Sequence, residues 1–198
     1  MESGMLVAFE GIDGTGKSTQ LQVLADYLKE QGFPAVTTYE PTESRYGRRI
    51  RELYRDRSSG GPEEELRLFI EDRRLHVDEL IKPGLAAGKI ILTDRYYYST
   101  AAYQGAAGMD PEGIFARNRF APVPDLVLLL TMDPEISIAR IREGRGEELN
   151  DFEQLDQLRK VADHFASFTD PCIVRIDAAR TPEQVQEDIR RTVQERLF

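Results

Sequence analysis

The chain has 198 residues, a length that suits one domain with a single well-covered hydrophobic core. Its 35 acidic and 26 basic side chains leave a net charge of -9, which repels a polyanion over most of the surface and argues against nucleic acid as the main partner. A single cysteine, Cys172, excludes an intrachain disulfide, and no apolar segment approaches the roughly 20 residues of a membrane span. Because the N-terminus also lacks the pattern of a secretory signal, we expect a cytoplasmic protein whose residues 1–198 form one domain.

Five short apolar runs predict buried β-strands, at residues 5–10, 35–39, 89–93, 126–132 and 172–176. Most of these runs are continuous rather than alternating, as expected for parallel strands that are covered on both faces. Apolar residues between them recur at helical spacing, and Thr181-Pro182-Glu183 is typical of a helix start. We therefore predict an α/β fold, with a five-stranded parallel sheet covered by helices on both faces and with ligands at the carboxyl ends of the strands. Cys172 is expected as a small buried residue of the last strand.

The most informative motif follows the first predicted strand and opens onto a predicted helix. Its sequence, Gly-Ile-Asp-Gly-Thr-Gly-Lys-Ser-Thr, fits the phosphate-loop pattern G-x-x-x-x-G-K-[ST]. Glycines let backbone N–H groups face the phosphates, and the helix start adds the positive end of its dipole. Lys17 supplies a positive charge for the β- and γ-phosphates, and Ser18 supplies a hydroxyl ligand for Mg²⁺. The residues expected to bind the triphosphate are Gly11, Ile12, Asp13, Gly14, Thr15, Gly16, Lys17, Ser18 and Thr19.

The third predicted strand runs into Asp94-Arg95. Asp94 can join Ser18 in holding Mg²⁺, while the planar fork of Arg95 suits two phosphate oxygens at once. No water-activating glutamate follows Asp94, which disfavours a motor or transport ATPase. Neither Asn118 nor Asn150 begins an Asn-Lys-x-Asp guanine motif, which disfavours a switch GTPase. An ion pair that merely closes the strand is the alternative interpretation, and the pattern favours transfer of a phosphoryl group to a second phosphate or a hydroxyl.

Four longer segments agree with the motifs of one known family. Residues 9–19 resemble its phosphate loop, residues 40–42 its Glu-Pro turn, residues 68–76 its base-binding helix, and residues 94–104 its signature Asp-Arg-Tyr/Phe-x-x-Ser-x-x-Ala-Tyr-Gln. Pro124-Asp125-Leu126 and Met132-Asp133-Pro134-Glu135 complete a pattern that covers nearly the whole chain. In these segments the chain resembles the thymidylate kinases. That resemblance implies the P-loop NTPase fold with a mobile lid, in a homodimer, and phosphorylation of thymidine monophosphate by ATP and Mg²⁺ toward dTTP.

The resemblance also implies how the acceptor is bound. Phe69 would stack on the thymine ring, and Arg73 would donate to a carbonyl oxygen of the base. Tyr103 would lie near the sugar and exclude a ribose 2′-hydroxyl, while Arg51 would help to hold the monophosphate. By periodicity alone Phe69 is a core residue, and Tyr103 has simple helix packing as its alternative. The full expected set for thymidine monophosphate is Asp13, Arg51, Phe69, Arg73, Arg95, Ser99, Thr100 and Tyr103.

A polar, glycine-containing segment at residues 142–150 interrupts the helical pattern, where the resemblance implies the lid. Arg142 and Arg145 would bring positive charge onto the transferring phosphoryl group, because no basic residue stands directly before Gly16. Solvated charges on a polar loop are the alternative interpretation. The expected catalytic residues are Lys17, Arg95, Asp13, Arg142 and Arg145.

Three departures from the family pattern bear on the nucleotide preference. Tyr39 stands where many members have Arg, Thr42-Glu43-Ser44 where many have Gly-Gly-Thr, and Phe165 where a Tyr is typical. None of them removes a phosphate-binding group. The sequence therefore leaves open a kinase for another nucleotide or for a nucleoside, and a catalytically inactive nucleotide-binding regulatory protein.

Overall fold

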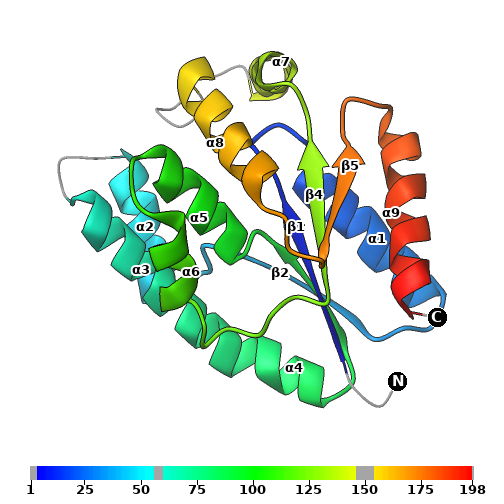
Figure 1. The fold of residues 1–198 in the computed structure, drawn as a ribbon. Helices are drawn as coiled ribbons and strands as arrows, with labels where there is room; N and C mark the ends of the chain where they lie inside the picture. Colours follow the sequence, from blue (N-terminus) through cyan, green and yellow to red (C-terminus); the bar gives the residue numbers. More distant parts are fainter. Residues whose placement is uncertain (1–3, 56–59, 146–153, 198) are drawn as a thin grey trace.

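A computed structural model describes residues 4–55, 60–145 and 154–197, and of residues 144, 145 and 197 the backbone alone. Across these ranges, five parallel strands form one sheet in the order β2-β3-β1-β4-β5 (Figure 1). The strands are β1 (Met5–Glu10), β2 (Ala35–Tyr39), β3 (Ile90–Asp94), β4 (Leu126–Thr131) and β5 (Ile173–Asp177). The predicted α/β class and the five-stranded parallel sheet are therefore confirmed. The prediction that Cys172 is a buried residue of the last strand is wrong, since Cys172 lies just before β5 and is only half-buried.

Helices follow every strand, as the alternating sequence pattern predicts. Between β1 and β2 runs α1 (Lys17–Glu30), and between β2 and β3 run α2 (Arg45–Arg55), α3 (Pro62–His76), the short π-helical segment η2 (Val77–Ile81) and α4 (Lys82–Ala86). The later helices are α5 (Tyr97–Ala106), α6 (Pro111–Arg117), α7 (Pro134–Arg145), α8 (Leu155–Ser167) and α9 (Pro182–Leu197).

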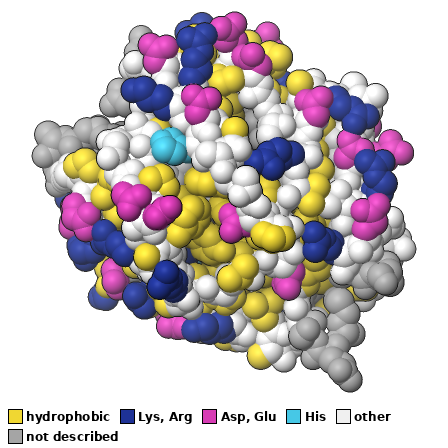
Figure 2. Space-filling view, viewed as in Figure 1, with side chains coloured by type: hydrophobic (Ala, Val, Ile, Leu, Met, Phe, Trp, Pro, Cys, Tyr) yellow, Lys and Arg dark blue, Asp and Glu magenta, His cyan; other side chains and the backbone are white. Residues whose placement is uncertain are grey.

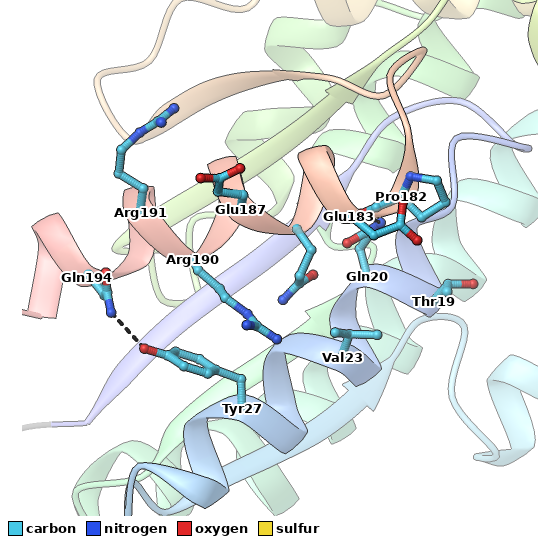
Figure 3. A pocket seen from close by; sticks show the side chains of 11 residues that line it. Thr19, Gln20, Val23, Tyr27, Pro182, Glu183, Glu187, Arg190, Arg191 and Gln194 are labelled. Carbon is cyan, nitrogen blue, oxygen red and sulfur yellow. Dashed lines mark hydrogen bonds between the residues drawn. The ribbon is translucent and has the colours of Figure 1, made fainter.

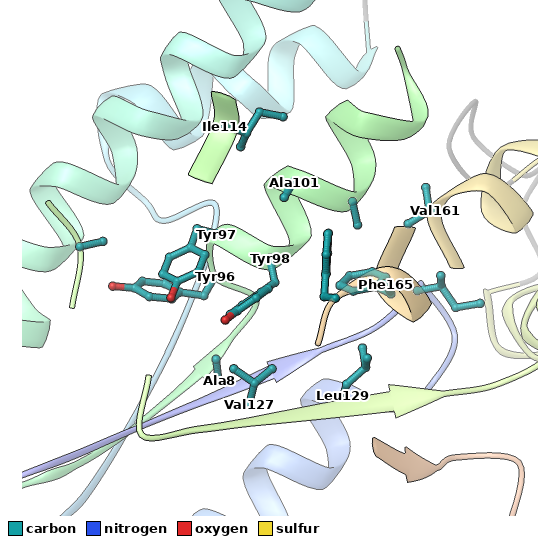
Figure 4. Close-up of a cluster of buried hydrophobic side chains, with 14 of the residues drawn as sticks. Ala8, Tyr96, Tyr97, Tyr98, Ala101, Ile114, Val127, Leu129, Val161 and Phe165 are labelled. Atoms are coloured by element: carbon teal, nitrogen blue, oxygen red, sulfur yellow. The ribbon is translucent and has the colours of Figure 1, made fainter. Parts of the chain in front are cut away.

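The two faces of the sheet carry separate hydrophobic cores. Along β1, Leu6 and Ala8 point to one face while Met5, Val7 and Phe9 point to the other, because side chains alternate along a strand. Helices α1 and α9 cover the second of these faces, and α5 and α8 pack against each other over the first. Aromatic rings fill much of this first core, where the tyrosines at the start of α5 lie above β1 and β4 (Figure 4).

Local sequence signals explain where α3 and α6 begin. Gly61 is extended, Pro62 occupies the first helical turn of α3, and three glutamates follow at residues 63–65, where they complement the helix dipole. The α6 start is capped by the Asp110 carboxylate, which accepts hydrogen bonds from the backbone N–H groups of Glu112 and Gly113.

The predicted polar interruption at residues 142–150 is wrong at its start, since α7 continues as a helix through Arg145. Buried Ile138 and Ile141 extend an apolar stripe at helical spacing, so the exposed side chain of Arg142 lies on the outer side of the same helix. The rest of the expected lid, residues 146–150, lies outside the described residues. Helix α8 begins at Leu155, and residues 151–153 before it also lie outside the described residues.

Charged side chains of both signs are interspersed on the face seen in Figure 2, while hydrophobic side chains gather in its middle. No helix in the described ranges combines the length and the apolar character needed to cross a membrane. On this face, neither the acidic nor the basic side chains gather into one patch.

Candidate functional site

The loop between β1 and α1 has a compact backbone that depends on its glycines. Gly11, Gly14 and Gly16 have positive φ angles of 134°, 80° and 86°. A Cβ atom at position 11 would also lie 2.3 Å from the carbonyl oxygen of Leu130, so only glycine lets the loop approach β4 this closely. The predicted phosphate loop therefore has the tight turn that brings backbone N–H groups together at the start of α1.

Lys17 is the first residue of α1, and its side chain is buried against this loop. Its Nζ donates a hydrogen bond to the carbonyl oxygen of Ile12 at 2.8 Å. Burial lowers the pKa of Lys17 to about 8, helped by the charge of Arg95 and opposed by nearby carboxylates, of which Asp13 is the strongest. The ammonium group remains mostly charged at pH 7, and its position at the loop suits it to pair with phosphate.

Ser18 and Asp94 meet at the carboxyl ends of two neighbouring strands. Ser18 lies in α1, which follows β1, and Asp94 is the last residue of the adjacent β3. The Ser18 hydroxyl donates a short hydrogen bond to the Asp94 carboxylate. Mg²⁺ in phosphoryl-transfer sites is commonly held by one or two protein oxygens together with the substrate phosphates. No cluster of three or more His, Cys, Asp or Glu side chains that could hold a metal alone occurs among the described residues. The pair thus fits Mg²⁺ bound jointly with phosphate.

Arg95 is the centre of a hydrogen-bonded cluster beside the phosphate loop. Its Nη2 donates to the Asp13 carboxylate at 2.7 Å and to the Tyr103 hydroxyl at 3.3 Å, and its Nη1 donates to Ser99 Oγ at 2.8 Å. The Tyr103 hydroxyl in turn donates to Asp13 at 2.8 Å. Burial raises the pKa of Asp13, but the charges of Arg95 and Lys17 outweigh it and lower that pKa to about 2. Four predicted acceptor residues are therefore linked in one charged cluster.

Glu10, the last residue of β1, holds this cluster through hydrogen bonds to Ser99. Its carboxylate is fully buried and accepts hydrogen bonds from Tyr96 N at 2.9 Å, Ser99 N at 3.1 Å and Ser99 Oγ at 2.5 Å. Burial raises the pKa of Glu10 to about 7, although these hydrogen bonds and the charge of Arg95 oppose the rise. Sequence reasoning missed this role. A lone carboxylate in an otherwise apolar buried strand was the available signal, because such a group needs partners.

Arg73 is buried in α3 and is held by other parts of the protein. Its Nε and Nη2 donate to Glu40 Oε2 at 2.8 and 2.6 Å, its Nη1 donates to Asn118 Oδ1 at 2.6 Å, and its Nη2 donates to Thr100 Oγ1 at 3.0 Å. His76 Nδ1 lies 2.9 Å from the other oxygen of Glu40. Burial would raise the pKa of Glu40, but Arg73 and His76 lower it. The acceptor that a buried guanidinium requires is thus supplied by Glu40, which the sequence showed only as part of the Glu-Pro turn.

Two other predicted acceptor residues have different surroundings. Phe69 is half-buried and packs against Ile50, Leu53 and Leu68, so one part of its ring belongs to a small core between α2 and α3. Arg51 donates from Nη1 to the carbonyl oxygen of Pro41 and from Nη2 to that of Thr42, both at 2.9 Å. The described contacts of Arg51 thus hold it against the turn after β2 and do not join it to the Arg95 cluster.

Arg142 and Arg145 were both predicted as lid arginines, but the structure describes only the side chain of Arg142. Arg142 is exposed on α7 and forms none of the described contacts with the phosphate loop. The side chain of Arg145 lies outside the described residues. On the preceding turn of α7, Arg140 donates from Nη1 to the carbonyl oxygen of Ala178 at 3.0 Å, which ties α7 to the loop after β5.

A cavity of about 430 Å³ opens beside the phosphate loop at the carboxyl ends of β2 and β3. Ser18, Tyr39, Asp94 and Arg95 all line it, so the predicted metal ligands share one space with the arginine that is predicted to bind phosphate. Carboxyl ends of parallel strands are the usual ligand-binding edge of such a sheet. This cavity therefore brings residues of the predicted donor site and of the predicted acceptor site to one space.

A second cavity, of about 620 Å³, lies between α1 and α9 (Figure 3). Thr19 is part of its lining, although it was predicted among the triphosphate-binding residues. In Figure 3 the side chains of Tyr27 and Gln194 meet across this space through a hydrogen bond of 2.7 Å. Buried Gln20 and Gln186 also line the cavity, and contacts such as the Tyr27–Gln194 hydrogen bond hold the two helices together.

Comparison with known proteins gives a consistent family assignment. The family model described as thymidylate kinase matches residues 9–189. A thymidylate kinase of Desulfotalea psychrophila is 51% identical over 194 residues, which cover 98% of this chain and 96% of the relative. A thymidylate kinase of Akkermansia muciniphila is 46% identical over 198 residues, with 98% and 93% covered, and a probable thymidylate kinase of Archaeoglobus fulgidus is 43% identical over 191 residues, with 96% and 95% covered.

Proposed function

The chain belongs to the thymidylate kinase family and is a phosphotransferase of thymidine monophosphate, and from this premise we propose how its residues divide the reaction between them. ATP is the donor, and its triphosphate would bind at the loop of residues 11–19. Thymidine monophosphate would present its phosphate to Arg95. The observation that carries this assignment is the Arg95 cluster, which places a guanidinium between Asp13 of the phosphate loop and Tyr103 of α5.

The reaction needs alignment and charge compensation, and no covalent intermediate. An oxygen of the acceptor phosphate would attack the γ-phosphorus of ATP while the bond from that phosphorus to the bridging oxygen of ADP breaks. Lys17 would offset negative charge on the β- and γ-phosphates, and Arg95 would hold the attacking phosphate in line. Asp13 would orient Arg95 and the acceptor sugar, since it already accepts from both Arg95 and Tyr103.

Mg²⁺ is proposed as the cofactor because Ser18 and Asp94 offer two adjacent oxygen ligands beside the loop. When bound, the ion would neutralise charge on the transferring phosphates. The two side chains would then share the ion in place of their direct hydrogen bond. Arg142 and Arg145 are proposed as further sources of positive charge for the phosphoryl group, on the resemblance of the sequence to the family.

Base recognition is proposed for the face of α3 that carries Phe69 and Arg73. Phe69 would stack on thymine with the part of its ring that the α2–α3 core leaves uncovered. Of the five N–H groups of Arg73, one from Nε, one from Nη1 and two from Nη2 already have protein acceptors. The second Nη1 proton would then be the one that meets a base carbonyl oxygen, with Thr100 beside it.

The test is a panel of deoxyribo- and ribonucleoside monophosphates, each incubated with ATP and Mg²⁺ and followed by ADP release. Thymidine monophosphate is expected to give the highest kcat/KM, and omission of Mg²⁺ is expected to abolish turnover. A clear preference for another acceptor would support the neighbouring hypothesis of a kinase for a different nucleotide or nucleoside. ATP binding without transfer to any acceptor would indicate a regulatory protein and contradict the proposal.

A homodimer of single-domain subunits in the cytoplasm is also proposed, on the resemblance of the sequence to its family. Sedimentation equilibrium at micromolar concentration is expected to give the mass of two chains. A mass of one chain over the whole concentration range would contradict the dimer and leave the proposed reaction untouched.

A further inference from the structure

Glu43 connects two side chains at the carboxyl end of β2. It lies in the turn between β2 and α2, where the family pattern more often has glycine. Its carboxylate accepts a hydrogen bond from the Tyr39 hydroxyl at 2.9 Å and another from Arg51 Nη2 at 2.8 Å. One negatively charged group therefore bridges the last residue of β2 and the arginine of α2 that is proposed to bind the acceptor phosphate.

One end of this bridge, Tyr39, borders the space in which the acceptor phosphate is expected. Tyr39 lines the cavity of about 430 Å³ together with Ser18, Asp94 and Arg95. Because Tyr39 and Arg95 line the same cavity, a phosphate bound there by Arg95 would lie near Tyr39. The Tyr39 hydroxyl, which now donates to Glu43, would then be shared between the substrate and Glu43.

The two partners of the ion pair are held very differently. Arg51 is anchored by hydrogen bonds to the carbonyl oxygens of Pro41 and Thr42, and its side chain is 32% exposed. The Glu43 side chain is 68% exposed, so its carboxylate can turn into water at little cost. Exchange of the anion on Arg51 therefore requires movement of Glu43 and leaves the arginine in place.

We propose that Glu43 weakens the binding of the acceptor, because its carboxylate competes with the acceptor phosphate for Arg51 and Tyr39. The inference rests on the proposed function, in which Arg51 binds the monophosphate. A phosphate dianion carries more charge and more acceptor oxygens than a carboxylate, so it displaces Glu43. Each binding event nevertheless includes the loss of the Glu43 contacts, which weakens the apparent affinity.

The experiment compares Glu43→Gln with the control Glu52→Gln in steady-state kinetics and in calorimetric binding of thymidine monophosphate without ATP. Glu52 is a neighbouring exposed glutamate of α2 that pairs with Arg49, so its replacement removes the same charge without touching Arg51. Glu43→Gln is expected to lower the KM and the Kd for thymidine monophosphate about two- to fivefold, the range of an exposed ion pair, with the KM for ATP unchanged. Glu52→Gln is expected to match the unmodified protein.

A double mutant identifies the route of the effect. In an Arg51→Met background, which itself is expected to raise the KM for thymidine monophosphate, Glu43→Gln is expected to lower that KM by less than it does in the unmodified protein, because only the competition for Tyr39 remains. An unchanged or raised Kd for Glu43→Gln alone would overturn the proposal, and a raised Kd would show that Glu43 positions Arg51 instead. Absence of turnover with thymidine monophosphate in the unmodified protein would overturn the proposed function, whereas the calorimetric comparison would still decide the role of Glu43.

Discussion

The guanidinium of Arg73 shows how a side chain can be expected from its sequence position and still acquire its role from the fold. Its position on α3, four residues after Phe69, indicates a shared face. Its orientation is set by Glu40 and Asn118, which come from the end of β2 and the end of α6. These partners fix the plane of the guanidinium, which in the proposed site decides which donor would remain for a base.

Lys17 gives the most direct prediction for a single residue. Lys17→Ala is expected to lower kcat by at least about a hundredfold with every acceptor, because it removes a charge that faces the phosphates in the transition state. The measurement is ADP release at saturating ATP and thymidine monophosphate. Lys29→Ala is the matched control, since Lys29 is an exposed lysine of the same helix. An equal loss of activity in both variants would contradict the catalytic role of Lys17.

Phe69 is expected to act on the acceptor alone. Phe69→Leu keeps an apolar side chain against the α2–α3 core but removes the ring, and it is expected to raise the KM for thymidine monophosphate about tenfold. The KM for ATP should stay within the error of the measurement. If both KM values rise together, the ring has a structural role only, and a parallel drop in the free energy of unfolding would show the same.

The start of α5 depends on a residue from a different element. α5 has no side-chain cap of its own at its N-terminus, and Arg95 before it has a φ of 72°, uncommon for a residue other than glycine. The Glu10 carboxylate from β1 accepts from the backbone N–H groups of Tyr96 and Ser99 and so stabilises this turn. Strand β1 thus carries both the phosphate loop and the support for the arginine that faces it.

Glu10 should make stability depend on pH in an unusual direction for a carboxylate. Its pKa in the folded protein is about 7, above the ordinary value of 4.5, so the folded state binds the proton more tightly than the unfolded state. The free energy of unfolding should therefore fall as pH rises from about 4.5 to about 7, by up to about 3 kcal/mol from this group.

Glu10→Gln isolates this contribution, because glutamine does not titrate. The difference in free energy of unfolding between the variant and the unmodified protein, measured with urea at several pH values, is expected to increase in favour of the variant between pH 5 and pH 7. A difference that is constant over this range would show that the pKa of Glu10 is not raised.

At the scale of the whole molecule, the strand order determines which loops meet. β1 lies between β3 and β4, so the phosphate loop after β1 lies beside Asp94 and Arg95 at the end of β3. The face of α3 that is proposed to recognise the base is tied to the end of β2 through the contact of Arg73 with Glu40. The proposed donor and acceptor sites are thus adjacent but are built from different elements.

Two adjacent sites should stabilise the fold separately. ATP with Mg²⁺ and thymidine monophosphate, each at a concentration 100 times its Kd, are expected to raise the free energy of unfolding by about 2.7 kcal/mol each. A non-hydrolysable ATP analogue avoids turnover in the thermal-shift measurement. Lys17→Ala is expected to lose most of the stabilisation by the analogue and to keep that by the monophosphate. Loss of both effects would indicate that the variant has a damaged fold.

The sequence by itself determined the strands, the phosphate loop and the family, because each of these depends on residues close together in the chain. Apolar runs and the spacing of Gly11, Gly16 and Lys17 carry that information directly. Only the tertiary structure decided the partners of the charged side chains. Glu40 and Arg73 are 33 positions apart, and Glu10 and Ser99 are 89 apart. A buried charged side chain needs a partner of opposite charge or a hydrogen-bond partner. The packing of elements far apart in the sequence selects that partner, so no local sequence pattern can identify it.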